Sequence, residues 1–598
     1  MDLDSEWIIS NSNGSYASST FSFANTRTYH GLLVRRDPSK TGSTVLLSKI
    51  FEEIRYGEDV FSMDTNYYRD AVFPDGFKFI EGYSDIPIPE WKFNFDNGHE
   101  LEKKIVMDQD SDTVLIRYKF SKTSPDSLYL HPLVSFRSFH GVIRSGSRNF
   151  SISHDQGRIR ISDGTSFLDI ASPGIFFEKG YWYYNFRYPR EEERGTNSEE
   201  DLYNPGVIVI DRPGTVLDIS ITADGKTMDF DSAVKKYRSF RSVKGGMADL
   251  RYNSMSFVMH DDMIAGFHWF GPWGRDTFIS MPGILLISGR FDDAKRILMH
   301  YAEGMQNGIV PNTLDVESLH FSADTSLWFI YAIQKYLEYS HDETFVKEML
   351  PHVKSVLDAY IKGNSMFSLD DGFVRVLGAP MTWMDALVSG RPVTPRTGIP
   401  VEINALWYNA LSFYSHVAAD LRGEGTRKFS DLAHHVRANF SKKFVRNDLI
   451  LDVADPDDAR FRPNFLIAYS LPYPLINDRK FVDLAWSKLA TPYGLRTLSP
   501  DDPDYIPHYA GPQPERDMAY HNGTVWPWLV GPFITAAVRT GYDRHLLLEK
   551  FAPLFSMERI PEIFDGTGDG TPRGCIMQAW SHGEVIRSYF EDLGGGTA

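Results

Sequence analysis

A change of hydrophobic periodicity near residue 230 constrains the fold of this 598-residue chain more than any other feature. Before it, short segments rich in β-branched and aromatic residues recur between turn-forming pairs such as Asp163-Gly164 and Pro213-Gly214. The expected strands are 44–47, 113–118, 150–153 and 206–210, with a further turn at 96–98. Many short strands at this spacing predict a large antiparallel β-sandwich.

After the change, apolar residues recur at the i, i+3, i+4 spacing of amphipathic helices. The predicted helices are 292–305, 324–339, 344–362, 402–419, 426–444, 480–489, 525–538 and 578–590. Long loops join them, and helices whose loops gather on one side are typical of an α/α toroid. We therefore predict a β-sandwich domain at 1–228, a linking helix within 229–246 and a helical domain at 247–598.

The amino-acid composition limits which partners and which cellular location we expect for this protein. The formal net charge of −17 disfavours nucleic acid and anionic membrane surfaces as partners. A single cysteine, Cys575, rules out an internal disulfide and favours the cytoplasm. Residues 1–6 lack the character of a signal peptide, and no run approaches the roughly 18 apolar residues of a membrane span. We therefore expect a soluble, cytoplasmic protein.

Segments that combine tryptophan with an acid, an arginine or a histidine are scattered through the helical part. They lie at 268–276, 382–385, 520–528 and 561–566. Sugars need this combination, because the C–H face of a sugar ring packs on an aromatic plane while its hydroxyls need polar partners. Two carboxylates in such a pocket are also the machinery of glycoside hydrolysis. The pattern predicts a carbohydrate-active enzyme.

Asp385 and Glu562 are the candidate catalytic carboxyls. Asp385 follows a Trp-Met pair, so we expect its carboxyl to be partly desolvated, with the raised pKa that a general acid needs. Glu562 is flanked by apolar residues and is the candidate general base. The alternatives are that Asp385 is a plain turn residue and that Glu562 pairs with Arg559 or Arg573.

Arg275 and Asp276 are a candidate pair for binding sugar hydroxyls. They open a helix after a loop that carries His268, Trp269 and Trp273, which is more ring area than a helix cap requires. The alternative is that Asp276 only caps the helix and interacts with its dipole.

Three further acids have adequate structural explanations. Asp324 heads a helix as a possible N-cap, and Trp328 one turn later is the only sign of another role. Glu402 is a first-turn acid, and Glu584 has the i, i+3 spacing to pair with Arg587. No H-E-x-x-H, phosphate-loop or G-x-S-x-G motif occurs, so no cofactor and no metal is expected.

Several segments follow one another in the order of a known family. They are Asn13-Gly14-Ser15-Tyr16, Thr26-Arg27-Thr28-Tyr29-His30-Gly31, Trp273-Gly274-Arg275-Asp276, Ala323-Asp324-Thr325-Ser326, Thr382-Trp383-Met384-Asp385, Thr394-Pro395-Arg396 with Val401-Glu402-Ile403-Asn404, Tyr520-His521-Asn522-Gly523 with Trp526, and Gly574-Cys575 with Gln578-Ala579-Trp580. Together they resemble the glycogen debranching enzymes, specifically the amylo-α-1,6-glucosidase part in its short archaeal and bacterial form.

This resemblance implies a β-sandwich followed by an (α/α)6 barrel like that of glucoamylase. It implies hydrolysis of single α-1,6-linked glucose residues at branch points of glycogen or limit dextrin. Arg275 and Asp276 would hold the terminal glucose, Asp385 would be the acid, and Glu562 the base, with Glu584 as the fallback. The implied substrate-binding residues are Arg275, Asp276, Trp273, Trp269, His268, Asp324, Trp328, Trp383, Arg396, Glu402, His521, Trp526, Gln578 and Trp580.

The chain departs from the large eukaryotic debranching enzymes in one respect. Nothing in it indicates the amylase-type barrel that carries their transferase activity. Whether the segment around Arg27 and His30 reaches the active site stays open.

Other readings remain. A glucoamylase- or trehalase-like enzyme would share the fold and cleave other glucosidic bonds, and a non-catalytic glycan-binding protein would keep only the aromatic platform. A phosphorylase on a similar barrel is weaker, since only Arg396 and Arg573 mark a phosphate site. The leading hypothesis is an inverting hydrolase, whose two carboxyls stand roughly 6.5–9.5 Å apart.

Overall fold

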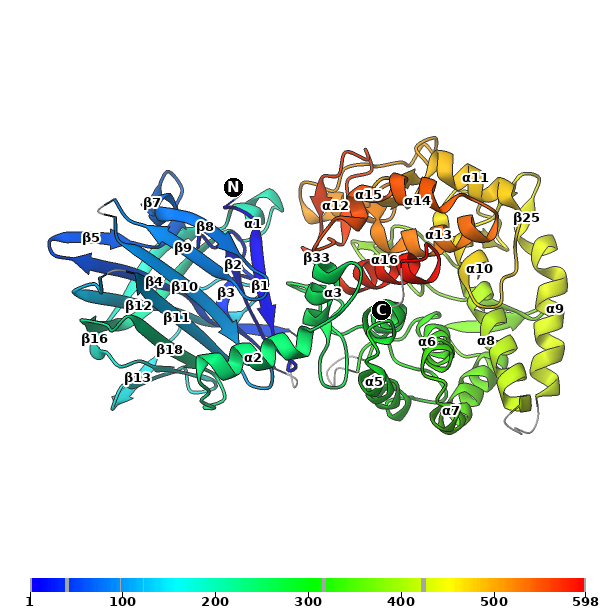
Figure 1. Ribbon diagram of the computed structural model, residues 1–598. Helices are drawn as coiled ribbons and strands as arrows, with labels where there is room; N and C mark the ends of the chain where they lie inside the picture. Colours follow the sequence, from blue (N-terminus) through cyan, green and yellow to red (C-terminus); the bar gives the residue numbers. More distant parts are fainter. Residues whose placement is uncertain are drawn as a thin grey trace. The chain divides into compact units, whose positions relative to one another are not determined.

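The computed structural model describes residues 3–37, 42–96, 98–121, 123–314, 319–420 and 426–595, so Asn97 of the predicted turn lies outside the described residues. The chain divides into two compact units (Figure 1). The first comprises Met1–Ser242 and Ser256–Met259, and the second comprises Val243–Met255 and His260–Ala598.

Two eight-stranded antiparallel sheets form the body of the first unit. The first sheet has the order β1-β2-β3-β4-β12-β17-β16, with β5 paired to β4, and the second has the order β13-β14-β15-β18-β11-β10-β9-β8. The strands of the first sheet are β1 (Glu6–Ser10), β2 (Tyr16–Thr20), β3 (Gly31–Arg36), β4 (Ser43–Tyr56), β5 (Asp59–Ser62), β12 (Ser127–Ser138), β16 (Ile175–Arg187) and β17 (Glu199–Asp211). Those of the second are β8 (Ile80–Ser84), β9 (Glu90–Asn94), β10 (Glu100–Met107), β11 (Thr113–Ser121), β13 (Ser151–Asp155), β14 (Arg158–Ser162), β15 (Phe167–Ala171) and β18 (Val216–Thr222).

The predicted strands overlap β4, β11, β13 and β17. Between the sheets lies an ion pair as well as apolar side chains. Lys103 of β10 donates to both oxygens of Glu52 on β4 at 2.7 Å, and the Tyr118 hydroxyl donates to the same carboxylate. A buried charge is tolerated only when it is paired and hydrogen-bonded in this way, so the contact fixes how the sheets face each other.

The predicted linking helix is α2 (Phe230–Arg241), and it belongs to the first unit. Its N-cap Asp229 accepts a hydrogen bond from the Ser232 amide at 2.9 Å. Arg241 in its last turn is buried and donates to the Ser10 carbonyl at 2.8 Å, which attaches the helix end to β1.

The second unit is helical. Its α-helices are α3 (Ala248–Ser254), α4 (Gly274–Met281), α5 (Phe291–Glu303), α6 (Thr325–Ser340), α7 (Glu343–Lys362), α8 (Val401–Asp420), α9 (Arg427–Phe444), α10 (Ile467–Ser470), α11 (Arg479–Lys488), α12 (Gln513–Tyr520), α13 (Val530–Arg539), α14 (Arg544–Lys550), α15 (Ala552–Phe555) and α16 (Ala579–Glu591). With α1 (Pro189–Glu193) and α2, the described residues form sixteen α-helices, and none of them is long and apolar enough to cross a membrane.

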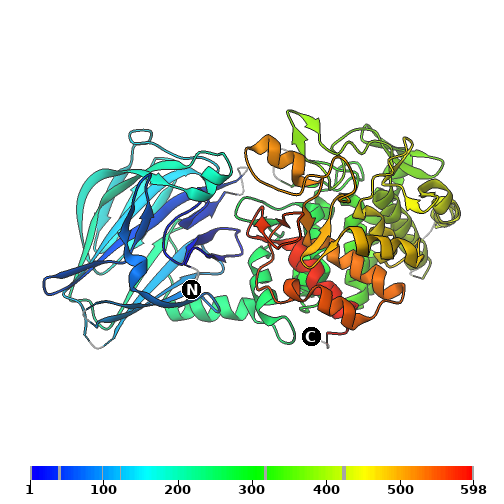
Figure 2. The same ribbon diagram turned by 90° about the horizontal axis from the view of Figure 1, so that it is seen from above.

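Six of these helices pack on one another in succession. α4 contacts α6, α6 contacts α8, α8 contacts α10, α10 contacts α13, α13 contacts α16, and α16 contacts α4. They are buried over most of their length, whereas α5, α7, α9 and α11 each bury one apolar face. Figure 2 shows α16, in red, lying among the other helices of its unit.

Glycine permits the closest of these crossings. A Cβ atom on Gly283 would lie 1.8 Å from the carbonyl oxygen of Gly583, and a Cβ on Gly583 would lie 2.7 Å from the Cα of Ser280. The pair therefore lets α16 approach the backbone that follows α4 more closely than any other residue would allow.

The prediction of one helix over 525–538 is wrong at its start. Val525–Trp526 forms strand β30 between β29 (Gly494–Arg496) and β31 (Ile563–Phe564), a 3-10 turn follows, and α13 begins only at Val530. The apolar run fits either structure, and the pairing with two neighbouring strands decides it.

Candidate active site

A cavity of about 380 Å³ opens in the second unit, within the size range of small-molecule sites. The predicted residues that line it are Trp273, Arg275, Asp276, Trp383, Asp385, His521, Trp526, Gln578 and Trp580. Its other lining residues are Phe270, Asn312, His320, Phe321, Ser322, Pro380, Thr382 and Tyr520. Segments from distant parts of the sequence thus meet at one hollow.

Arg275 is fixed by Asp324. Its Nε and Nη2 donate to the two Asp324 oxygens at 2.7 and 2.9 Å, a bidentate pair that is almost fully buried. Asp324 also accepts from the Ser322 hydroxyl at 2.6 Å and makes no side-chain cap to α6. The structure therefore places Asp324 behind the cavity wall, orienting Arg275, and the N-cap explanation is wrong.

Asp276 lines the cavity from the first turn of α4. The backbone of this turn is held by Asn312, whose carbonyl accepts from the Gly274 amide at 2.8 Å and whose side-chain oxygen accepts from the Arg275 amide at 3.0 Å. Burial raises the pKa of Asp276 to about 8; Arg275 opposes this rise, and the carboxylates of Asp385 and Glu562 add to it. Asp276 is thus predominantly protonated at neutral pH and can donate as well as accept a hydrogen bond.

Asp385 points into the same cavity. Its Oδ2 accepts from Arg275 Nη1 at 3.2 Å, and 42% of its side chain remains exposed. Desolvation nevertheless raises the pKa of Asp385, and the nearby Arg275 charge partly opposes the rise. The raised pKa expected from the Trp-Met neighbourhood is therefore present.

Glu562 is buried directly behind Tyr520, which lines the cavity. The Tyr520 hydroxyl donates to Oε1, and the Cys575 amide donates to Oε2 at 2.9 Å. Gly574 has φ +69°, and a Cβ there would lie 2.2 Å from Oε2, so only glycine leaves room for this carboxylate. Of the two partners considered for Glu562, Arg573 instead pairs with Asp565 at 3.0 Å.

An indole cluster supports the wall next to Asp385. Trp383 lies edge-on to Trp526, Trp528 and Trp580, with ring centroids 5.3, 5.1 and 6.3 Å away. His521 also packs against Trp383, at 5.3 Å, and both of its ring nitrogens are buried without a hydrogen-bond partner among the described residues. Burial first, and then the charge of Arg462, holds the pKa of His521 well below its usual value, so the ring is neutral.

A buried polar network anchors the loop that carries Asp385. Arg396 is clamped by Glu402 and by Asp452, whose Oδ2 lies 2.7 Å from Arg396 Nε. Asn464 connects this cluster to the loop, because it donates to Asp452 at 2.7 Å and accepts from the Trp383 indole at 2.8 Å. Arg396 and Glu402 are therefore not on the cavity wall; they brace it from behind.

Other predicted residues also lie off the wall. His268 follows β19 (Gly266–Phe267) and is buried, Trp269 packs on Phe270 at 6.2 Å, and Trp328 packs edge-on to Tyr331 at 5.3 Å. None of the three is among the cavity-lining residues of the described chain.

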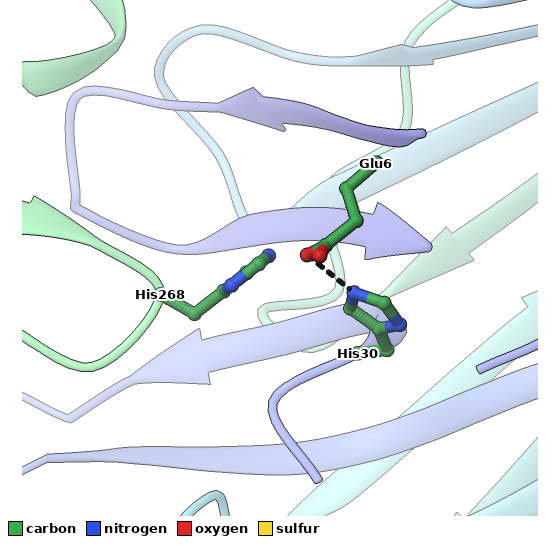
Figure 3. Close-up of side chains that lie close together, drawn as sticks. All are labelled: Glu6, His30 and His268. Carbon is green, nitrogen blue, oxygen red and sulfur yellow. Dashed lines mark hydrogen bonds and ion pairs between the residues drawn. The ribbon is translucent and has the colours of Figure 1, made fainter. Parts of the chain in front are cut away.

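Glu584 is paired within α16, with Arg587 Nε 2.8 Å from its Oε1 and Arg587 Nη2 2.9 Å from its Oε2. Arg27 and His30 belong to the first unit, where both contact Glu6. Figure 3 shows the His30 Nε2 contact with Glu6, at 3.1 Å.

The residues that sequence reasoning missed are mostly amides and a phenol. Asn312 and Asp452 stand in loops and Asn464 in a short 3-10 helix, all without a nearby tryptophan or catalytic-type motif, so no local signal marks them. Tyr520 had a signal, since it lies within the Tyr-His-Asn-Gly segment, but its hydroxyl contact with Glu562 depends on the fold.

Two family models match the chain. The model described as amylo-alpha-1,6-glucosidase matches residues 252–587, and the one described as glycogen debranching enzyme N terminal matches residues 5–215. The glycogen debranching enzyme of Saccharomyces cerevisiae is 26% identical over 371 residues, in an alignment that covers 44% of this chain and 24% of the yeast enzyme. The chain therefore spans only about a quarter of that relative.

A bacterial glucoamylase solved in complex with acarbose is similar in structure. The TM-score is 0.62 at 14% sequence identity, covering 100% of this chain and 93% of the glucoamylase. This similarity shows a sheet domain and a helical region with a glucoamylase-like fold, and the amylo-alpha-1,6-glucosidase model, which covers more than half of the chain, shows a glycoside hydrolase. More particularly, the chain belongs to the amylo-alpha-1,6-glucosidase family, with a debranching-enzyme N-terminal domain.

Proposed function

We propose that this protein releases single α-1,6-linked glucose residues from the branch points of a glycogen-type α-glucan. The family supports an α-glucan substrate. The observation that carries the proposal is that Arg275, Asp276 and Asp385 line one cavity, while Glu562, far away in the sequence, is buried directly behind Tyr520 in the wall of the same cavity.

In this mechanism Asp385 donates its proton to the glycosidic oxygen as the bond to C1 breaks. Glu562 removes a proton from a water that attacks C1 from the opposite face, so the product is β-glucose. Arg275 and Asp276 hold hydroxyls of the departing glucose. The pairing of Glu584 with Arg587 favours Glu562 as the base.

We also propose that the six helices that pack in succession, α4, α6, α8, α10, α13 and α16, are the inner ring of an (α/α)6 barrel. Their closed order of contacts and the similarity to glucoamylase support this.

The deciding experiment measures glucose release from phosphorylase-trimmed limit dextrin and follows the anomer by NMR. We expect release of β-glucose, with isomaltose, maltose and trehalose cleaved much more slowly. Preferential cleavage of maltose or trehalose would instead favour the glucoamylase-like or trehalase-like alternative, and initial release of α-glucose would overturn the inverting mechanism.

A further inference from the structure

The outer side of the first sheet carries a row of ringed side chains away from the sandwich core. We call it the aromatic face and define it by Phe51 of β4, Tyr129 and His131 of β12, and Phe177, Tyr181 and Tyr183 of β16. All six lie in the first unit and are at least partly exposed.

Strand register puts these residues on one side. Phe51 and His131 are directly opposite each other in the β4–β12 pair. Tyr129 is opposite Val209 of β17, and Val209 is opposite Ile175 of β16. In β4 and β12, the residues that alternate with these rings are buried against the second sheet. Because successive side chains of a strand point to opposite faces, the row of rings faces outward.

Four of the six rings form a continuous row. Tyr181 and Tyr183 have centroids 5.2 Å apart, Tyr183 and Phe51 6.2 Å, and Phe51 and His131 5.6 Å. At one end the rings rest on the buried apolar cluster of Leu133, Phe186 and Leu202, so their orientation is fixed rather than free in solvent.

The outer part of the face is strongly exposed. Phe177 is 54% exposed and Ile175 is 64% exposed, on a strand that ends the sheet. A contiguous exposed apolar patch of this kind marks a binding surface more often than it marks an ordinary solvated face.

Polar atoms at the face suit a sugar chain. The hydroxyls of Tyr181 and Tyr183 lie 3.1 Å apart, and Glu53 Oε2 lies 3.6 Å from His131 Nε2. Ring planes flanked by hydroxyls, a carboxylate and an imidazole can stack on glucose units and bond their hydroxyl groups.

A second copy of the chain fits the face less well. The ladder between β16 and β17 shifts register at two places, between Glu178 and Tyr181 and between Tyr183 and Phe186, and such irregularities protect an edge strand from pairing. Glu53 lies at the face, and a net charge of −17 opposes self-association, whereas a neutral polymer meets no such repulsion.

We propose that the aromatic face is a second carbohydrate site that holds an outer chain of the α-glucan while the cavity processes a branch point. The choice of an α-glucan as occupant rests on the proposed function. A polymer with many chain ends can occupy both sites, which would raise its affinity relative to that of a short fragment.

The test compares the full-length protein with its Phe177→Ala/Tyr181→Ala/Tyr183→Ala variant, and with Phe177→Ala alone as the change least able to disturb folding. Affinity electrophoresis in gels containing glycogen measures the dissociation constant without requiring catalysis. We expect it to rise about tenfold in the triple variant, because the stacking area is lost. Glucose release from a short singly branched oligosaccharide should stay within about twofold, a change too small to indicate a lost contact.

Val216→Ala, which removes an exposed apolar side chain from the second sheet, is the matched control and should leave glycogen binding unchanged. Glycogen binding by Phe177→Ala and by the triple variant equal to that of the unsubstituted protein would overturn the proposal. So would light scattering that shows a dimer dissociating on substitution, since a second copy would then be the occupant. The two proposals can fail separately. If the unsubstituted protein releases no glucose, the proposed function is rejected. If the triple variant of that protein nevertheless loses glycogen binding, the carbohydrate site on the aromatic face is supported.

Discussion

Arg275 Nη1 and Asp385 Oδ2 lie 3.2 Å apart although 110 residues separate them in the sequence. The contact joins the arginine that we propose to bind glucose to the proposed acid, and Asp324 holds the other side of the same guanidinium. Since the positive charge opposes the desolvation of Asp385, it limits how far the carboxyl pKa rises. Arg275 therefore has two roles in our proposal, because it influences the pKa of Asp385 and also contacts the substrate.

Replacing Asp385 by Asn should remove the proton donor while keeping the side-chain shape. We expect kcat on limit dextrin to fall by at least about 10²-fold with little change in KM, as for loss of a general acid. Steady-state glucose release gives both constants, and a variant with near-full turnover would reject Asp385 as the acid. In the unsubstituted protein, activity should fall as the pH rises past the raised pKa of Asp385, because the acid must be protonated.

The two candidate bases can be separated by parallel substitutions. Glu562→Gln should lower kcat by about 10²-fold or more, since it removes the proposed base. Glu584→Gln should leave kcat within about threefold but lower the Tm, because it breaks a buried pair with Arg587. The opposite pattern of kcat losses would transfer the role of base to Glu584.

The protonation of Asp276 links stability to pH. Its pKa is about 8 in the folded protein and near the ordinary value of 3.8 when unfolded, so the folded state binds the extra proton between these values. The free energy of unfolding therefore falls as pH rises from about 4 to 8. Above that range the buried carboxylate is ionised in the folded protein, so the stability cost of its burial no longer grows.

Asp276→Asn should accordingly raise the Tm more at pH 8.5 than at pH 5, by roughly 1–2 °C for each kcal/mol gained in a unit of this size. The same substitution should weaken substrate binding. Calorimetry at the two pH values measures the difference. Asp448→Asn, at a carboxyl that is almost fully exposed, is the control and should show no such trend. Equal Tm changes at both pH values would contradict a raised pKa at Asp276.

Much of the architecture was predictable because periodicity reports which face of an element is buried. Outer helices such as α7 and α9 have one apolar face and match their predicted ranges within one residue. The prediction for 525–538 was wrong at its start because periodicity does not report strand pairing, and β30 pairs with β29 and β31, which come from distant parts of the sequence.

The sequence predicted those parts of the candidate site that depend on neighbours in the chain, but not those that depend on packing between distant segments. The position of Asp385 beside Trp383 predicts a desolvated carboxyl from the sequence neighbours alone. Asp324 looked like a helix cap because its position fits one, yet its carboxylate faces Arg275 across the unit. Asn464 carries no local sign of its function, since both of its partners come from other segments.

Asn464→Ala tests whether that bracing network matters for catalysis. The change leaves the Trp383 indole N–H and one Asp452 oxygen without this partner, so we expect stability to fall by about 1–3 kcal/mol. It should also lower kcat, because the loop that carries Asp385 loses an anchor.

Asn409→Ala is the matched control for that experiment. Asn409 is equally buried, donates to Gln334 at 2.8 Å and accepts from the Tyr473 amide at 3.2 Å, and it is not a cavity-lining residue. It should lose similar stability in urea unfolding while kcat is unchanged. Equal kcat losses in both variants would show that the effect is general destabilisation.

The crossing of α16 with α4 and the segment after it gives a prediction in which the direction of the stability change distinguishes two outcomes. Alanine normally stabilises a helix interior by about 1 kcal/mol relative to glycine. At Gly583 the new Cβ would lie 2.7 Å from the Cα of Ser280, a backbone atom that cannot rotate away, so Gly583→Ala should instead destabilise by about 1–3 kcal/mol. Gly378→Ala, where an added Cβ meets nothing within 4 Å, should leave the Tm almost unchanged. A Gly583→Ala protein more stable than its parent in thermal unfolding would mean that α16 does not approach this backbone as closely as the structure places it.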